Sequence, residues 1–272
     1  MQVDLERKVT RFVVQEYVNA IVNFKSQTEL DFDVHKLIHT FEVVDVAHKL
    51  IDLTNPKLPK KLQNQIINAA ILHDIGRCHE FEKGQLKKNF DHGQDGYLWI
   101  KKYFPHLIVE GTSTQWHNKC PSESDPLAAQ PVLNYVRDAD MLGNLIYEIK
   151  KMPVFMDHIL KLFKERPTGL TLDNEIVQAA LQNRSCCRSQ MKKCDFLDMI
   201  LSQLLWIYNL RTQAGFTFAK KEKIFPRCRD IIVSHVLPVI QGSEKQKKQL
   251  ETQIKQLFPD EMFLKEFEKH GI

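Results

Sequence analysis

Apolar residues recur every three or four positions along most of this 272-residue chain. That spacing puts them on one face of a helix, whereas a half-buried strand alternates every second residue. No strand-length alternating run bounded by hairpin turns occurs. The first helix is expected over about residues 3–25, where the apolar stripe consists of Leu5, Val9, Phe12, Val13, Tyr17, Ala20, Ile21 and Phe24. The pattern predicts an all-α fold.

Local signals place further helices along the chain. The same period runs over residues 41–51 and over the Ala-rich segment 66–72, which should end by Gly76. Asp91 and Gln94 resemble a capping box that opens a helix over 93–104, which Pro105 ends. Pro131 suits the first turn of a helix that continues to about 149. Further helical patterns cover about 152–165, 172–183, 195–213, 222–240 and 243–257.

No clear linker divides the chain, so we expect a single helical domain over residues 1–272. The segment 184–194 lacks apolar periodicity and is either a weak candidate for a domain boundary or a surface loop inside one domain. With 43% hydrophobic and 26% charged residues, the composition is that of an ordinary globular protein.

Cysteine usage and hydropathy bear on the cellular setting. The six cysteines contain no C-x-x-C pair, which excludes a zinc-finger interpretation. The N-terminus lacks the apolar core of a signal peptide, and no run of 18 apolar residues occurs. We therefore expect a cytoplasmic protein with reduced thiols and no membrane partner. The net charge of +4 favours anionic substrates without requiring a nucleic acid.

Histidines and aspartates suggest a metal centre. Imidazole and carboxylate ligands together suit divalent transition ions, whereas calcium prefers oxygen alone. The carboxylate of Asp74 follows a strongly apolar run, where burial without a partner would be costly, so a positive group should face it. The candidate ligands are His39, His73, Asp74, His92, His117 and Asp140.

The order of these residues resembles that of the HD-domain superfamily of metal-dependent phosphohydrolases, and in particular its uncharacterised bacterial members. The segments that carry the resemblance are HTFEVVDVA, AAILHDIGR, DHGQDGYLWI, QWHNK and YVRDADML. The similarity is close over about residues 35–150, which would form the metal-binding core of a helical bundle, with 151–272 as additional C-terminal helices.

The resemblance implies specific ligands. His39, His73, Asp74 and Asp140 match the family set that holds one ion. His92 and His117 fall where relatives with two metals place further histidines, which would bind a second ion bridged through Asp74. Alternatively, these two histidines contact the substrate phosphate. One or two ions are expected, iron or manganese in the first place, with magnesium, cobalt, nickel or zinc as alternatives.

Some positions leave a choice or depart from the family pattern. Asp138 and Asp140 both fit the last ligand position, and the resemblance favours Asp140, with Asp138 pairing with Arg137 or a ligand histidine. Cys78 stands where the family has an aromatic residue, and Met141 where it has a lysine. If that lysine assists substrate binding in relatives, this chain must use another cation or another substrate.

The chemistry expected of such a centre is attack of metal-activated water on phosphorus. Asp74, Arg77 and Lys119 are the predicted catalytic residues, because the two cations closely follow ligand positions and can stabilise charge on phosphoryl oxygens. The alternative for both cations is an ordinary surface ion pair. Trp116, beside His117, is a candidate for the pocket wall. No role is assigned to His35, His48, His79, His106, His158, His235 and His270.

The predicted function is hydrolysis of a phosphomonoester or phosphodiester in a small metabolite or nucleotide. Di-iron oxygenase chemistry, which some HD-fold proteins perform with the same ligand types, is the first alternative. A non-catalytic metal-binding or ligand-sensing module is the second. The Gly-rich phosphate-binding motifs of nucleotide-binding folds are absent, so a nucleotide would be held by metal and cations. The natural substrate and the oligomeric state are not predicted.

Overall fold

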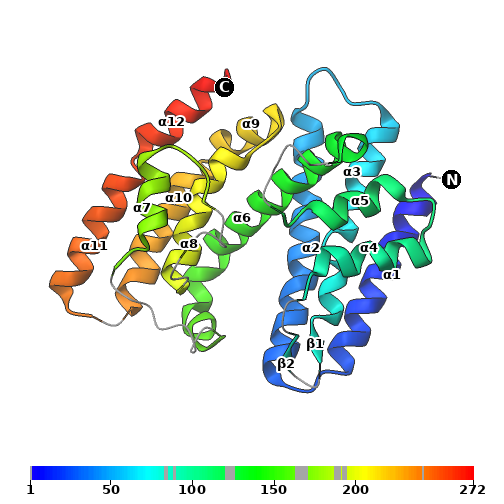
Figure 1. Cartoon of the computed structure of the whole chain (residues 1–272), viewed down its shortest axis with the longest axis horizontal. Coiled ribbons are helices and arrows are strands. Elements are labelled where there is room, and N and C mark those ends of the chain that lie inside the picture. The colour runs from blue at the N-terminus through cyan, green and yellow to red at the C-terminus, as the bar shows by residue number, and fades with distance from the viewer. Residues whose placement is uncertain are drawn as a thin grey trace. The chain divides into compact units, whose positions relative to one another are not determined.

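Helices form nearly all of the regular structure in the computed structural model, which confirms the all-α prediction. The structure describes residues 2–82, 85–87, 90–119, 126–162, 171–186, 191, 195–240 and 242–272. These divide into two compact units, Met1–Gly143 and Asn144–Ile272 (Figure 1). The expected single domain over 1–272 stays a prediction.

The first unit contains the longer helices of the N-terminal half. Two of the connections between its helices contain short 3-10 turns, at Ile75–His79 and Leu127–Ala129. Residues 130–143 belong to the start of a longer helix. The helices are α1 (Gln2–Val22), α2 (Gln27–Leu53), α3 (Lys60–Leu72), α4 (His92–Tyr103), α5 (Ile108–Trp116) and α6 (Gln130–Leu162).

The predicted apolar stripe lies on α1, which packs against α2 and α3, except that Phe24 lies beyond the end of the helix at Val22. Val9 and Tyr17 are completely buried, and Val13 is nearly so. Burial of each such side chain contributes about 1.5–3 kcal/mol. The last turns of α3, residues 66–72, are buried among α1, α2 and α5. This buried end of α3 carries His73 and Asp74 into the interior.

Side-chain caps fix where two helices of this unit begin. The hydroxyl of Ser26 accepts a hydrogen bond from the backbone amide of Glu29 at the start of α2. The carboxylate of Asp91 accepts one from the amide of Gln94 at the start of α4, as the sequence predicted. Such caps contribute about 1 kcal/mol each.

Three elements differ from the expectations. Helix α5 was not predicted, because its nine residues, IVEGTSTQW, carry a weak apolar period and gain their order by packing on α4. Helix α6 runs through Pro153, where two helices were expected, although proline removes one backbone hydrogen bond. A small hairpin pairs β1 (Phe81–Glu82) with β2 (Gln85–Leu86), which is too short to show an alternating pattern.

The second unit is built from shorter helices that follow the rest of α6. The aromatic rings of Phe225 and Phe263 stack in its core with their centres 5.8 Å apart. Its last helix lies beyond the predicted patterns, and much of 184–194 lies outside the described residues. The elements are α7 (Asn174–Leu181), α8 (Phe196–Leu204), a 3-10 turn (Leu205–Asn209), α9 (Gln213–Lys221), α10 (Ile224–Ile231), a π-helical turn (Ile232–Val236), a 3-10 turn (Leu237–Val239), α11 (Glu244–Leu257) and α12 (Asp260–Lys269).

The described residues were considered for membrane-spanning helices and for the state of their cysteines. None of the helices found there is both long and apolar enough to span a membrane. Cys78 and Cys228 are free thiols. Cys120, Cys187 and Cys194 lie outside the described residues.

Candidate metal centre

Helix ends and two helix interiors bring the predicted ligands together inside the first unit. His73 and Asp74 directly follow α3, His117 directly follows α5, and His92 is the first residue of α4. His39 lies within α2 and Asp140 within α6. The four histidines and Asp74 are buried, and the side chain of Asp140 is 21% exposed. The site is therefore an interior cluster with one more open edge.

The carboxylate of Asp74 lies between two pairs of histidines. Its Oδ2 atom is 3.6 Å from Nε2 of His73 and 4.0 Å from Nε2 of His39. Its Oδ1 atom is 3.4 Å from Nε2 of His92 and 3.5 Å from Nε2 of His117. Each oxygen thus faces its own pair of imidazoles, and the two groups His39–His73–Asp74 and Asp74–His92–His117 are each compact enough to hold an ion.

Asp140 completes the first of these groups. Its Oδ1 atom lies 3.0 Å from Nε2 of His39 and 3.7 Å from Nε2 of His73. Of the two candidate aspartates, Asp140 is the one that these contacts place beside the histidines. Asp138 is fully buried, and Arg137 donates to the carbonyl oxygens of Trp116 and Lys119.

Backbone carbonyls set the orientation of two imidazoles. Nδ1 of His73 lies 2.7 Å from the carbonyl oxygen of Ala70, and Nδ1 of His117 lies 2.6 Å from that of Thr114. Because a carbonyl can only accept, both Nδ1 atoms carry a proton, and Nε2 is the ring nitrogen that faces Asp74. Nε2 of His73 is buried without a hydrogen-bond partner among the described residues. Such orientation by an outer hydrogen bond is typical of metal-binding histidines.

The electrostatics of the cluster also fit a cation. Burial lowers the pKa of His73 to about 4 and that of His92 to about 2, so both imidazoles are neutral at pH 7. Burial alone would raise the pKa of Asp74, but the charges of Lys36, His73 and Arg77 hold it well below its usual range. For Asp140, the hydrogen bond with His39 outweighs the effect of burial and also lowers the pKa. Two carboxylates with neutral imidazoles suit a divalent transition ion.

Positive groups face Asp74 on both oxygens, as its burial led us to expect. Arg77 places Nε 3.4 Å from Oδ1 and Nη1 2.6 Å from Oε2 of Glu80. Lys36 places Nζ 2.9 Å from Oδ2. Lys36 was missed by the sequence analysis. Its one signal is the spacing to His39, three residues later on the same helix face.

Lys119, two residues after His117, contacts Asp91 and Trp116. Its ammonium is 3.7 Å from Oδ2 of Asp91 and 5.0 Å above the ring centre of Trp116. The side chain is 37% exposed, so Lys119 and Trp116 lie together near the surface after α5. Burial raises the pKa of the Cys78 thiol, so this residue remains protonated beside the site.

Close backbone contacts bring α4 to the cluster. A Cβ atom on Gly76 would lie 2.1 Å from the carbonyl oxygen of His92, and one on Gly93 would lie 2.8 Å from that of Gln115. Only glycine permits such an approach. On another side, the hydroxyl of Tyr17 donates to the carbonyl oxygen of Asp74 at 3.0 Å. These contacts hold His92 and Asp74 at a fixed separation.

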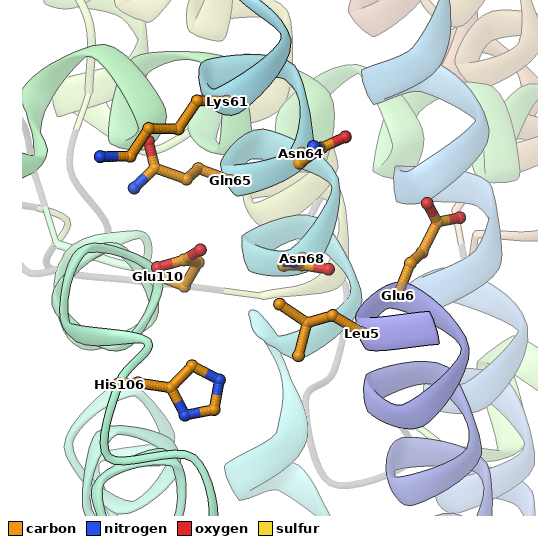
Figure 2. Close-up of a pocket in the computed structure, with 8 residues that line it drawn as sticks. All are labelled: Leu5, Glu6, Lys61, Asn64, Gln65, Asn68, His106 and Glu110. Atoms are coloured by element: carbon orange, nitrogen blue, oxygen red, sulfur yellow. The ribbon is translucent and has the colours of Figure 1, made fainter. Parts of the chain in front are cut away.

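A separate polar cavity of about 200 Å³ lies beside α3 and contains none of the six predicted ligands. Figure 2 shows Gln65 extending from α3 on the side of Glu110, the carboxyl of which is buried and has a raised pKa. The lining residues are Leu5, Glu6, Lys61, Asn64, Gln65, Asn68, His106 and Glu110.

Comparison with known proteins agrees with this cluster. Residues 37–145 match the family model of the HD domain, so this part of the chain is similar to HD domains. HD domains form a helical superfamily of metal-dependent phosphohydrolases, and the match contains every predicted metal ligand. No curated protein and no solved structure matches the chain.

Proposed function

We propose that this protein is a metal-dependent phosphohydrolase that acts on a small phosphorylated metabolite or nucleotide. The observation that carries the proposal is the position of Asp74, with each carboxylate oxygen facing a different pair of histidines. A carboxylate between two such groups is suited to bridge two cations. Centres with two ions recur in enzymes that cleave phosphate esters.

The proposed ligands follow from the two groups of side chains. His39, His73, Asp74 and Asp140 would hold one ion, and His92 and His117 would hold a second together with Asp74. Divalent ions supply Lewis acidity toward a phosphoryl oxygen and lower the pKa of water. Iron and manganese are the first candidates because imidazole and carboxylate ligands suit them.

Two cations of the chain are available to bind the phosphoryl group, Arg77 and Lys119. Arg77 is held by Asp74 and Glu80, which fixes its guanidinium beside the carboxylate that would bridge the ions. Lys119 follows His117 by two residues and is 37% exposed beside Trp116, so it can meet an incoming anion. We assign both residues to stabilisation of negative charge on the phosphoryl group.

Metal analysis combined with a phosphate-release screen tests the proposal. The wild type and Asp74→Ala are loaded with iron or manganese and assayed on nucleotides, cyclic nucleotides and sugar phosphates. His48→Ala, which changes an exposed histidine on α2, is the control. We expect phosphate release by the wild type and the control, and neither bound metal nor activity in Asp74→Ala. Full activity of Asp74→Ala would exclude the assignment.

The same preparations distinguish the alternative functions. Oxygen consumption by the iron-loaded protein, without phosphate release from any substrate, would assign di-iron oxygenase chemistry. Bound metal without either reaction would assign a sensor or binding module.

A further inference from the structure

Lys36 differs from the other cations of the site in its hydrogen-bond partners. Among the described residues, its ammonium has one hydrogen-bond partner, Oδ2 of Asp74 at 2.9 Å. The guanidinium of Arg77 is shared between the carboxylates of Asp74 and Glu80. Lys119 contacts Asp91 and the ring of Trp116. Lys36 is thus the cation that lies at the cluster without a second anchoring carboxylate.

The position of Lys36 puts its charge next to the first histidine group. Oδ2 of Asp74, which it contacts, is the oxygen that faces His39 and His73. The side chain of Lys36 is 13% exposed, so its flexible stem reaches the cluster from the surface. Lysine can move its ammonium by a few ångströms through rotation about its side-chain bonds, whereas the arginine fork is fixed by its two partners.

The contacts of the Lys36 ammonium would change when the site binds divalent ions and substrate. When Asp74 shares its charge with divalent ions, the ammonium is no longer needed to neutralise the carboxylate. A buried or half-buried ammonium then requires another anion close by. The anion that enters this cluster under the proposed function is a phosphoryl group.

We propose that Lys36 is a phosphate-binding residue, which contacts a non-bridging phosphoryl oxygen of the substrate beside Asp74. This inference rests on the proposed function and names a residue that the sequence motifs did not indicate. If the lysine that relatives have in place of Met141 assists substrate binding, Lys36 would supply that charge in this chain. Lysine is a common phosphate ligand that acts as a point charge.

The experiment measures binding of inorganic phosphate to the manganese-loaded protein by calorimetry, with manganese content determined on the same samples. The variants are Lys36→Met, which removes the charge and keeps the length, and Lys36→Arg, which keeps the charge. Lys49→Met is the matched control, because Lys49 is an exposed lysine on α2 that pairs with Asp45.

We expect Lys36→Met to retain manganese and to bind phosphate about 10- to 100-fold more weakly, as for loss of one hydrogen bond to a charged group. Lys36→Arg should recover part of the affinity, and Lys49→Met should match the wild type. Phosphate binding by Lys36→Met at wild-type affinity would overturn the inference. Loss of manganese in Lys36→Met would also overturn it, because Lys36 would then serve to position Asp74.

The two proposals can fail separately. If no substrate is hydrolysed but phosphate binding depends on Lys36, the hydrolase assignment fails and the phosphate-binding role stands. If the wild type hydrolyses a phosphate ester and Lys36→Met binds phosphate normally, the reverse holds.

Discussion

His73 and His117 present their Nε2 atoms to opposite oxygens of the same carboxylate, at 3.6 and 3.5 Å from Asp74. Each residue directly follows a helix, and each donates from Nδ1 to the carbonyl oxygen three residues earlier. The same local contact is therefore used twice. The ends of α3 and α5, rather than flexible loops, fix the two halves of the centre.

Replacement of Asp74 should abolish metal binding at both groups. Asp74→Ala removes the one carboxylate that faces all four histidines, so we expect loss of bound metal together with phosphate release. Asp95→Ala, which breaks an ion pair with His79 outside the centre, should keep both. Elemental analysis and initial rates on the same preparations provide the measurement. Retention of two metal equivalents by Asp74→Ala would contradict the bridging role.

Removal of either outer histidine should leave one ion in place. His92→Ala and His117→Ala each disrupt the second group but leave His39, His73 and Asp140 intact. We expect the metal content to fall from two equivalents to one, and X-ray absorption on the wild type to find ions about 3.5–4 Å apart. A wild-type content of one equivalent under saturating manganese would leave these histidines as phosphate contacts.

Arg77 and Lys119 should affect catalysis more than metal binding. We expect Arg77→Ala and Lys119→Ala to keep bound metal and to lower kcat on the order of 10²-fold, comparable to loss of one oxyanion donor. Lys221→Ala, which alters an exposed lysine in the second unit, serves as the control. Wild-type rates for both site variants on every active substrate would remove their assigned role.

Gly76 should tolerate no side chain. Its added Cβ would meet the backbone oxygen of His92, which cannot move without displacing α4, so Gly76→Ala should lower the free energy of unfolding by about 1–3 kcal/mol or more. Gly111→Ala is the matched control, because its Cβ would meet the side chain of Ile100 at 3.2 Å, which can adjust. Urea unfolding of the two variants provides the comparison. Equal destabilisation would show that the contact of Gly76 with α4 is not restrictive.

The stability of the second unit should depend on the ionisation of Glu148. Burial raises the pKa of Glu148 from 4.5 to about 8, with Gln203 and Cys228 as partners of its carboxyl. Between these values the unfolded chain has lost a proton that the folded chain retains, so stability should fall as the pH rises from about 4.5 to 8. Glu148→Gln cannot ionise and should lack this loss.

Urea unfolding at both ends of that pH window checks the prediction for Glu148. The stability of Glu148→Gln relative to the wild type should increase toward pH 8 by several kcal/mol, because each pKa unit corresponds to about 1.4 kcal/mol. Glu251→Gln, on the surface of α11, should show no such change. A constant difference between Glu148→Gln and the wild type at both pH values would refute it.

Local signals allowed much of the first unit to be predicted. The stripe of α1 and the cap at Asp91 depend on residues a few positions apart, and the sequence displays both directly. Helix α5 could not be predicted, because its order comes from contact with α4, which no spacing reveals. The continuation of α6 through Pro153 likewise contradicts the local preference of proline.

In the candidate site, too, some residues could be predicted from local motifs and others depend on tertiary packing. A motif can nominate Asp74 or His117 because each stands in a recognisable segment. Lys36 has no such segment, and only the fold of α2 against the end of α3 brings its ammonium to Asp74. The contact between Gly76 and His92 joins two segments sixteen positions apart, so it too depends on tertiary packing.

The hydrogen bond from Tyr17 to the carbonyl oxygen of Asp74 bears on the choice of boundaries for expression fragments of this protein. Tyr17 and Lys36 both precede residue 37, where the family match begins. An expression fragment trimmed to 37–145 would retain every predicted metal ligand and yet lack the residues that contact Asp74 through its backbone and its Oδ2 atom. The smallest fragment that keeps this centre intact must therefore include α1 and the whole of α2.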